Sequence, residues 1–134
     1  MDLIEKHDMM MPILEACPSF RPVWEEFVEE WRSEPEQPLY LALGGLARHL
    51  IAAMSVGDVS TVSLTLAVVE RWLLEGDKYV REAATVGLLE DLQNTNLHET
   101  TSPSDFEPYL LPKSLKAWKD VGRFWEERVI IPDE

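Results

Sequence analysis

The chain has 134 residues, of which 46% are hydrophobic, so it is long enough to fold as one domain around an apolar core. Acidic residues outnumber basic ones by 25 to 12, which gives a formal net charge of −13. This charge repels phosphate backbones and anionic lipid surfaces, so we expect no nucleic-acid or membrane partner, and it attracts basic proteins. Solubility alone is the alternative explanation of the charge.

The beginning of the chain does not resemble a signal peptide. Asp2, Glu5 and Asp8 stand where a basic region and an apolar run would be needed. No apolar run approaches the roughly 18 residues of a membrane span, so we expect a cytoplasmic protein. The one cysteine, Cys17, allows no intramolecular disulfide framework, and we expect it to be a small packing residue.

The first quarter of the chain, residues 1–36, is acid-rich and predicts two helices. The first covers Leu3–Ala16 and is kinked or restarted at Pro12. The second begins at a Ser19 cap and carries an apolar stripe that includes Trp24 and Trp31. Its other side is covered by a set of glutamates, namely Glu25, Glu26, Glu29 and Glu30.

The middle of the chain, residues 39–94, predicts helical hairpins. Apolar residues at three- and four-residue steps indicate helices over Leu39–Val56 and Val59–Glu75, followed by a third helix that ends near Leu92. The pairs Gly57-Asp58 and Gly76-Asp77 separate them. Glycine suits the left-handed position after a helix, and aspartate suits the cap of the next one, so each pair predicts a tight antiparallel connection.

Two adjacent glycines, Gly44 and Gly45, fall inside the first of these helices. Each lowers helix stability by roughly 1 kcal/mol relative to alanine. We expect the close approach of a neighbouring helix to be the reason for them.

The last part of the chain, residues 104–128, predicts further helical structure. Pro112 opens the final helix, because proline is tolerated at a first helical position. Its exposed side carries a basic row, which we expect to face solvent or acids of the same molecule, made of Lys113, Lys116, Lys119 and Arg123. No segment alternates as a strand would. We therefore expect one all-α domain over residues 1–134, with six to seven helices in a short antiparallel stack.

The segment that starts at Asp77 resembles the second helix of a HEAT-type repeat. The resemblance lies in the order of a capping aspartate, Val80-Arg81, a small pair Ala83-Ala84, and Leu88-Leu89. It implies HEAT-like packing of hairpins. It also implies that Arg81 reaches an aspartate of the neighbouring hairpin, for which Asp58 is the candidate.

A longer resemblance covers about Leu39 to Glu127. The segments that carry it are Gly57-Asp58, Val69–Asp77, Val80-Arg81, Val86–Asn94, Phe106–Ser114, Trp118 and Phe124-Trp125. Together they look like a small bacterial all-helical family, some members of which resemble immunity proteins for polymorphic toxins. The resemblance implies that the chain neutralises a cognate toxin, and it leaves the acidic first quarter outside.

The sequence contains no arrangement that demands catalysis. Neighbouring acids on a helix point about 100° apart, so they do not converge on one reacting atom. Glu70, Glu90, Asp91 and His49 could meet as a metal site, but no Glu-x-x-His pair supports one. We expect no enzyme activity, no cofactor and no metal. A small hydrolase or a metal-dependent enzyme is the least favoured alternative.

Binding of a basic protein is the favoured function, with occlusion of a toxin as its most concrete form. The expected contact residues are Glu70, Trp72, Glu75, Glu90, Asp91 and Asn94, with steering by Glu25, Glu26, Glu29 and Glu30. Trp72 is the tryptophan expected to be partly exposed, while the other four, Trp24, Trp31, Trp118 and Trp125, are expected in the core. A helical adaptor or regulatory scaffold that binds a basic partner is the second candidate.

Overall fold

The fold is all-α, as predicted. A computed structural model describes residues 2–130, and side chains as far as Arg123. Seven α-helices lie in this range: α1 (Met10–Ala16), α2 (Arg21–Glu30), α3 (Leu39–Ser55), α4 (Val59–Glu75), α5 (Lys78–Glu82), α6 (Glu90–Leu92) and α7 (Pro112–Ile130). Short 3₁₀ turns join several of them. The one extended pairing among the described residues is an isolated bridge between Ile4 and Gly76.

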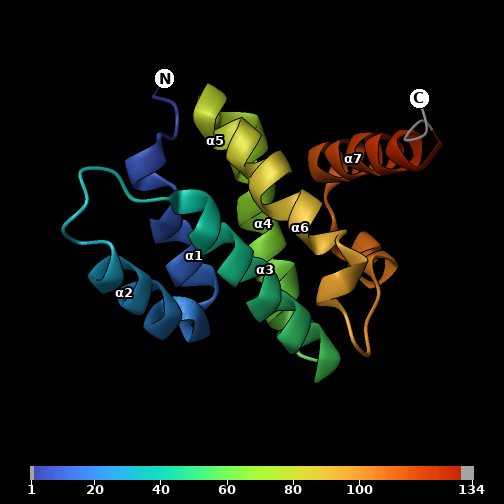
Figure 1. The fold of residues 1–134 in the computed structure, drawn as a ribbon, viewed down its shortest axis with the longest axis horizontal. Helices are drawn as coiled ribbons and strands as arrows, with labels where there is room; N and C mark the ends of the chain where they lie inside the picture. The colour runs from blue at the N-terminus through green and yellow to red at the C-terminus, as the bar shows by residue number, and fades with distance from the viewer. Residues whose placement is uncertain (1, 131–134) are drawn as a thin grey trace.

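The helices form a stack with α3, α4 and the α5–α6 segment at its centre (Figure 1). Helices α1 and α2 lie on one side of this centre, and α7 lies on the other, so α2 and α7 are at opposite ends of the view. The α5–α6 segment is continuous, because the π-helical stretch η3 (Ala83–Leu89) joins its two α-helical parts.

The connections between the central helices form largely as predicted. Gly57 has a φ of +79°, the left-handed conformation that favours glycine. The Asp58 carboxylate accepts a hydrogen bond from the Thr61 amide at 3.2 Å, and Asp77 accepts one from the Val80 amide at 2.9 Å. Both aspartates therefore cap the helices that follow them.

The left-handed conformation predicted for the glycine of the second pair is wrong at Gly76. Its φ is −79° and its ψ is 155°, so it is extended and not left-handed. Glycine is required there because a Cβ would collide with the Trp72 carbonyl oxygen and the Val80 side chain. Ile4 lies alongside and exchanges backbone hydrogen bonds of 2.9 Å with the residues that flank Gly76, which places Gly76 in an extended pairing.

This pairing also changes the first predicted helix. Because Ile4 is extended, the segment before Met10 forms only the 3₁₀ turn η1 (Lys6–Asp8). Helix α1 starts at Met10 and places Pro12 in its first turn, where proline is tolerated. The sequence allowed a restart near Pro12, but it did not show the pairing of Ile4.

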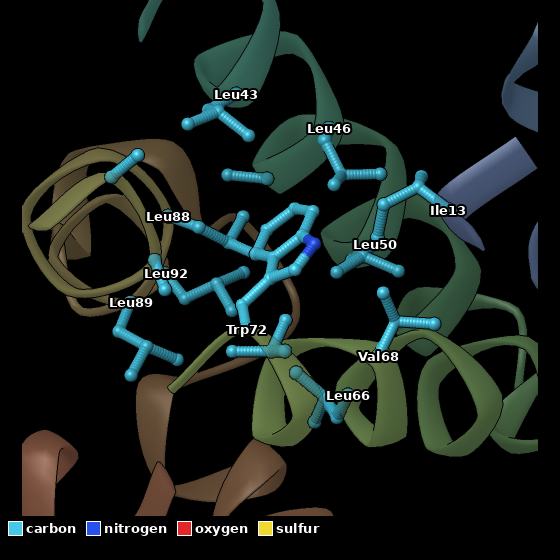
Figure 2. Packing of buried hydrophobic residues seen from close by; sticks show 14 of the residues in the cluster. Ile13, Leu43, Leu46, Leu50, Leu66, Val68, Trp72, Leu88, Leu89 and Leu92 are labelled. Carbon is cyan, nitrogen blue, oxygen red and sulfur yellow. The ribbon is translucent and has the colours of Figure 1, made fainter. Parts of the chain in front are cut away.

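The core is centred on Trp72, which is 0% exposed (Figure 2). Its indole is surrounded by leucines of α3 and of the α5–α6 segment, and its Nε1–H donates to the Met9 carbonyl at 3.0 Å. The expectation that Trp72 is partly exposed is therefore wrong. The amphipathic tip of a tryptophan can be fully buried when a backbone carbonyl satisfies its N–H, as it is here.

The other tryptophans lie at least partly within the core where the structure describes them. Trp118 is buried, and Trp24 and Trp31 are half-buried against the core. Trp24 stacks on Phe27 with ring centroids 5.4 Å apart. The side chain of Trp125 lies outside the described residues.

The closest helix contact occurs at a different glycine from the pair that was predicted. A Cβ on Gly87, in η3, would lie 2.8 Å from the Leu43 side chain of α3. Gly44 and Gly45 have no neighbour that close, so the expectation that close helix packing explains them is wrong. Since η3 contains Gly87, the widened π-helical stretch is also where this helix packs most closely on α3.

Two predicted polar contacts are replaced by others. The Arg81 side chain donates to its own helix's Asp77 carbonyl at 3.4 Å, and among the described side chains no ion pair joins Arg81 to Asp58. Ser19 does not cap α2, which begins after the 3₁₀ turn η2 (Pro18–Phe20). Its hydroxyl lies 2.8 Å from His49 Nε2 instead.

Candidate protein-binding surface

The residues predicted to bind a partner do not form one site. Glu70 is only 9% exposed, and its carboxylate accepts hydrogen bonds from the Lys113 amide at 3.0 Å and the Ser114 amide and hydroxyl at 2.8 Å each. A side chain of α4 thereby caps the first turn of α7. Glu70 and the buried Trp72 are part of the folded core, so neither of them presents a contact surface to a partner.

Glu75 and Asn94 are accessible but lie in different places. Glu75 is exposed at the end of α4, where it forms an ion pair with Arg71 at 3.7 Å. The Asn94 side chain accepts a hydrogen bond from the Asn96 amide at 3.0 Å and so caps the short 3₁₀ turn η4 (Thr95–Leu97). Asn94 thus has a local structural role.

Glu90 and Asp91 are half-buried at the start of α6. Asp91 lies over α3, with its Oδ2 atom 3.4 Å from the position that a Cβ on Gly44 would occupy. Burial raises the pKa of Asp91, the neighbouring Glu90 raises it further, and Arg48 opposes both. The Asp91 carboxylate therefore packs between α6 and α3 at an ordinary contact distance from Gly44.

The four glutamates of α2, which were predicted to steer the partner, are exposed on the surface. Glu25, Glu26, Glu29 and Glu30 are all exposed on this one helix. Among the described ion pairs, only Glu29 has a partner, Arg32, at 3.1 Å. The end of α2 thus presents a concentration of negative charge with little local neutralisation.

A groove runs between α2 and α3 beside these glutamates. Its volume is about 320 Å³, and it is lined by apolar residues of both helices and by Glu26 and Glu30. A second hollow of about 490 Å³ lies on the tryptophan side of α2 and is lined by Trp24 and Trp31 together with charged residues of both signs. Helix α2 is therefore flanked by a hollow on each side.

A larger hollow lies at the other end of the molecule, next to α7. It measures about 870 Å³ and is lined by Lys116, Lys119 and Arg123 of the basic row, and by Asp120. Asp120 accepts from Lys116 Nζ at 3.2 Å and from the Arg123 guanidinium, and these hydrogen bonds lower the pKa of Asp120. Part of the basic row is thus matched by an acid of its own helix, which was one of the two expected outcomes.

One contact has the residue types of a hydrolytic site. The Ser19 hydroxyl lies 2.8 Å from His49 Nε2, and burial lowers the pKa of His49 while the charge of Asp58 opposes this shift. The carboxylate of Asp58, however, accepts from the hydroxyl of Thr61 at 2.7 Å and from its amide. Asp58 therefore caps α4 and does not orient the imidazole as a triad acid would.

Within the described part of the chain, no three His, Cys, Asp or Glu side chains are grouped so that they could hold a metal ion. None of the described helices has both the length and the apolar character needed to cross a bilayer.

Sequence reasoning missed the groove because its walls are apolar residues outside the core. Val23 belongs to the apolar stripe of α2 and Leu41 is an apolar residue of α3, yet they are 43% and 60% exposed. The available signal was Gly45, an interior helix glycine that the fold does not require. Which two faces lie beside each other depends on how α2 packs, and hydrophobic periodicity does not give that information.

Comparison with known proteins identifies a family. The family described as Domain of unknown function (DUF7674) matches residues 10–126. The match includes α1 and α2, which the resemblance seen in the sequence had left outside. No curated protein and no solved structure matches the chain.

Proposed function

The chain belongs to the DUF7674 family, and we propose that it is a protein-binding domain that covers a basic partner with the acidic face of α2. The domain acts by occlusion and needs no chemistry of its own. The observation that carries the proposal is the placement of Glu25, Glu26, Glu29 and Glu30, all exposed on one helix with one basic neighbour.

These glutamates lower the stability of the helix that carries them. Glu25 and Glu29, like Glu26 and Glu30, are four residues apart, a spacing at which like charges destabilise a helix by roughly 0.2–0.5 kcal/mol per pair. Glu29 and Glu30 also lie in the last turn of α2, where negative charge is unfavourable to the helix dipole. Charges placed against the preference of their own helix favour a role in binding over a role in folding.

The partner should carry a basic surface. A net charge of −13 raises the rate at which a basic protein associates, and an acidic helix can occupy the rim of a site that binds anionic substrates. Neutralisation of a cognate bacterial toxin is the concrete form that we propose. Its support is the resemblance of residues 39–127 to immunity-like proteins.

Co-expression with the protein encoded next to this chain tests the proposal. If the neighbour is a toxin, the wild-type chain should restore growth and co-purify with it. A variant with Glu25, Glu26, Glu29 and Glu30 changed to glutamine should do neither. A control in which Asp2, Glu5, Glu82 and Glu99 are changed to amides has the same net charge and should retain both effects.

Each alternative result has a defined meaning. Co-purification with a neighbour that does not inhibit growth would support the adaptor function and contradict toxin neutralisation. Equal loss of binding in the two neutralised variants would show that net charge alone acts, and would overturn the role of α2.

A further inference from the structure

Gly45 lies in the middle of α3, where glycine weakens a helix, and the fold does not explain it. Its φ is not in the left-handed range, which Gly57 alone adopts among the described glycines. Apart from the adjacent residues and the backbone of α3 itself, a Cβ built on Gly45 would meet Val23 Cγ1, at 3.9 Å, which is an ordinary contact. Alanine would therefore fit at this position. What the missing side chain provides is open space in the groove between α2 and α3.

The groove is built to receive apolar side chains. Its floor is formed by Phe27, Ala42 and Gly45, and its walls by Val23 and Leu41, which are exposed in the chain alone. A volume of about 320 Å³ is at the lower limit for small-molecule sites and suits a few side chains of a docked segment. Glu26 and Glu30, on the α2 side, place negative charge along the edge.

Helix α2, which forms one side of this groove, is held to the rest of the fold by few buried residues. Phe27 is its one buried side chain, whereas α3 buries seven. An apolar groove between two helices with charges on its edge is the form of site in which an amphipathic helix docks. The acidic edge determines the charge of the helix that fits.

We propose that the groove between α2 and α3 binds an amphipathic, basic helix of the protein partner. Apolar side chains of that helix fill the space over Gly45 between Val23 and Leu41, and its lysines or arginines contact Glu26 and Glu30. This inference rests on the proposed function. It specifies the element of the partner that is bound, a helix, and the place where that helix binds. One groove combines a glycine that the fold does not require, exposed apolar walls and an acidic edge.

A synthetic peptide provides the first test. The probe is a fluorescein-labelled peptide of about 15 residues, with leucine on one helical face and lysine elsewhere, because shorter peptides are poorly helical. Its binding to the full chain is followed by fluorescence anisotropy. Gly45→Leu, which fills the groove, should weaken binding about tenfold or more. Gly45→Ala adds one methyl group to the groove, so it should weaken binding less than Gly45→Leu and should raise the midpoint of thermal unfolding.

A matched pair of surface leucines distinguishes binding in the groove from nonspecific hydrophobic binding to the surface. Leu41 in the groove and Leu74 on α4 are each 60% exposed. Leu41→Gln should weaken peptide binding by about fivefold or more, while Leu74→Gln should leave it unchanged. Equal effects of these two substitutions, or equal affinity of Gly45→Leu and Gly45→Ala, would overturn the inference. Circular dichroism and thermal unfolding confirm that each variant is folded.

The same variants distinguish failure of this inference from failure of the proposed function. If the neighbouring gene product binds Gly45→Leu as tightly as the wild type, the groove is not its site, although protein binding by the domain stands. If that protein does not bind at all while the peptide distinguishes the variants as expected, the groove stands and the proposed partner is wrong.

Discussion

At the scale of single residues, Glu70 shows how a side chain that looks like a surface acid can be structural. Its carboxylate replaces the missing helical partners of two α7 amides. Glu70→Ala should lower the free energy of unfolding by about 2–3 kcal/mol, because it removes a cap and leaves buried donors unpaired. Glu70→Gln retains an acceptor and should cost less. Urea unfolding measures both.

Glu75→Ala is the control for this prediction, since Glu75 is on the same helix but is exposed and paired only with Arg71. Exposed ion pairs contribute about 0–1 kcal/mol, so this variant should be nearly as stable as the wild type. Equal effects at the two positions would contradict the capping role of Glu70.

Asp91 gives a prediction about pH. Burial, and secondarily Glu90, raise the pKa of Asp91, so the folded chain holds this proton to a higher pH than the unfolded chain does. The free energy of unfolding contributed by Asp91 therefore falls as pH rises from the ordinary aspartate range through the raised pKa. Asp91→Asn removes this loss.

The stability of Asp91→Asn relative to the wild type should consequently increase as the pH rises from about 3.5 to about 7. The lower value is below the ordinary aspartate pKa, and the range extends well above it. Urea unfolding at several pH values provides the comparison. A relative stability that is flat or decreases over this range would show that Asp91 is not held in a disfavoured charged state. Asp2→Asn, at an exposed aspartate, is the control for the pH series itself.

At the scale of helices, the sequence predicted those elements whose signals are local. Asp58 and Asp77 cap α4 and α5 as expected, and Pro112 opens α7. Predictions that depended on a distant partner were less successful. Gly76 is extended where it pairs with Ile4, and the buried Trp72 donates its indole N–H to the Met9 carbonyl. Neither partner is near in sequence, so spacing could not reveal them.

Helix α2 should be the least stable of the longer helices. It buries only Phe27, and its four glutamates repel each other. Local opening free energies follow buried contacts, so the amides of α2 should exchange with solvent at least about tenfold faster than those of α3. Hydrogen exchange followed by mass spectrometry measures this difference. Equal protection of the two helices would show that α2 is held as firmly as the core.

At the scale of the whole molecule, charge and exposed apolar surface coincide at the α2 end, while α7 with its basic row lies at the other end (Figure 1). Composition predicted an acidic surface for a basic partner, and helical periodicity placed four of the acids on one helix. Glu70, which was also predicted to contact a partner, looks like any helix glutamate in the sequence, although it is buried in the structure. Its burial follows from the docking of α7 on α4.

The rate of association between this chain and its partner tests the central claim most directly. Stopped-flow measurements would use the co-purifying neighbour protein at about 0.01 M and 0.15 M ionic strength, where the screening lengths differ about threefold or more. We predict that the four-glutamine variant of α2 associates about tenfold more slowly than the wild type at low salt, and that the equally charged control does not. Equal rates for these two variants would contradict the claim that α2 is the binding face.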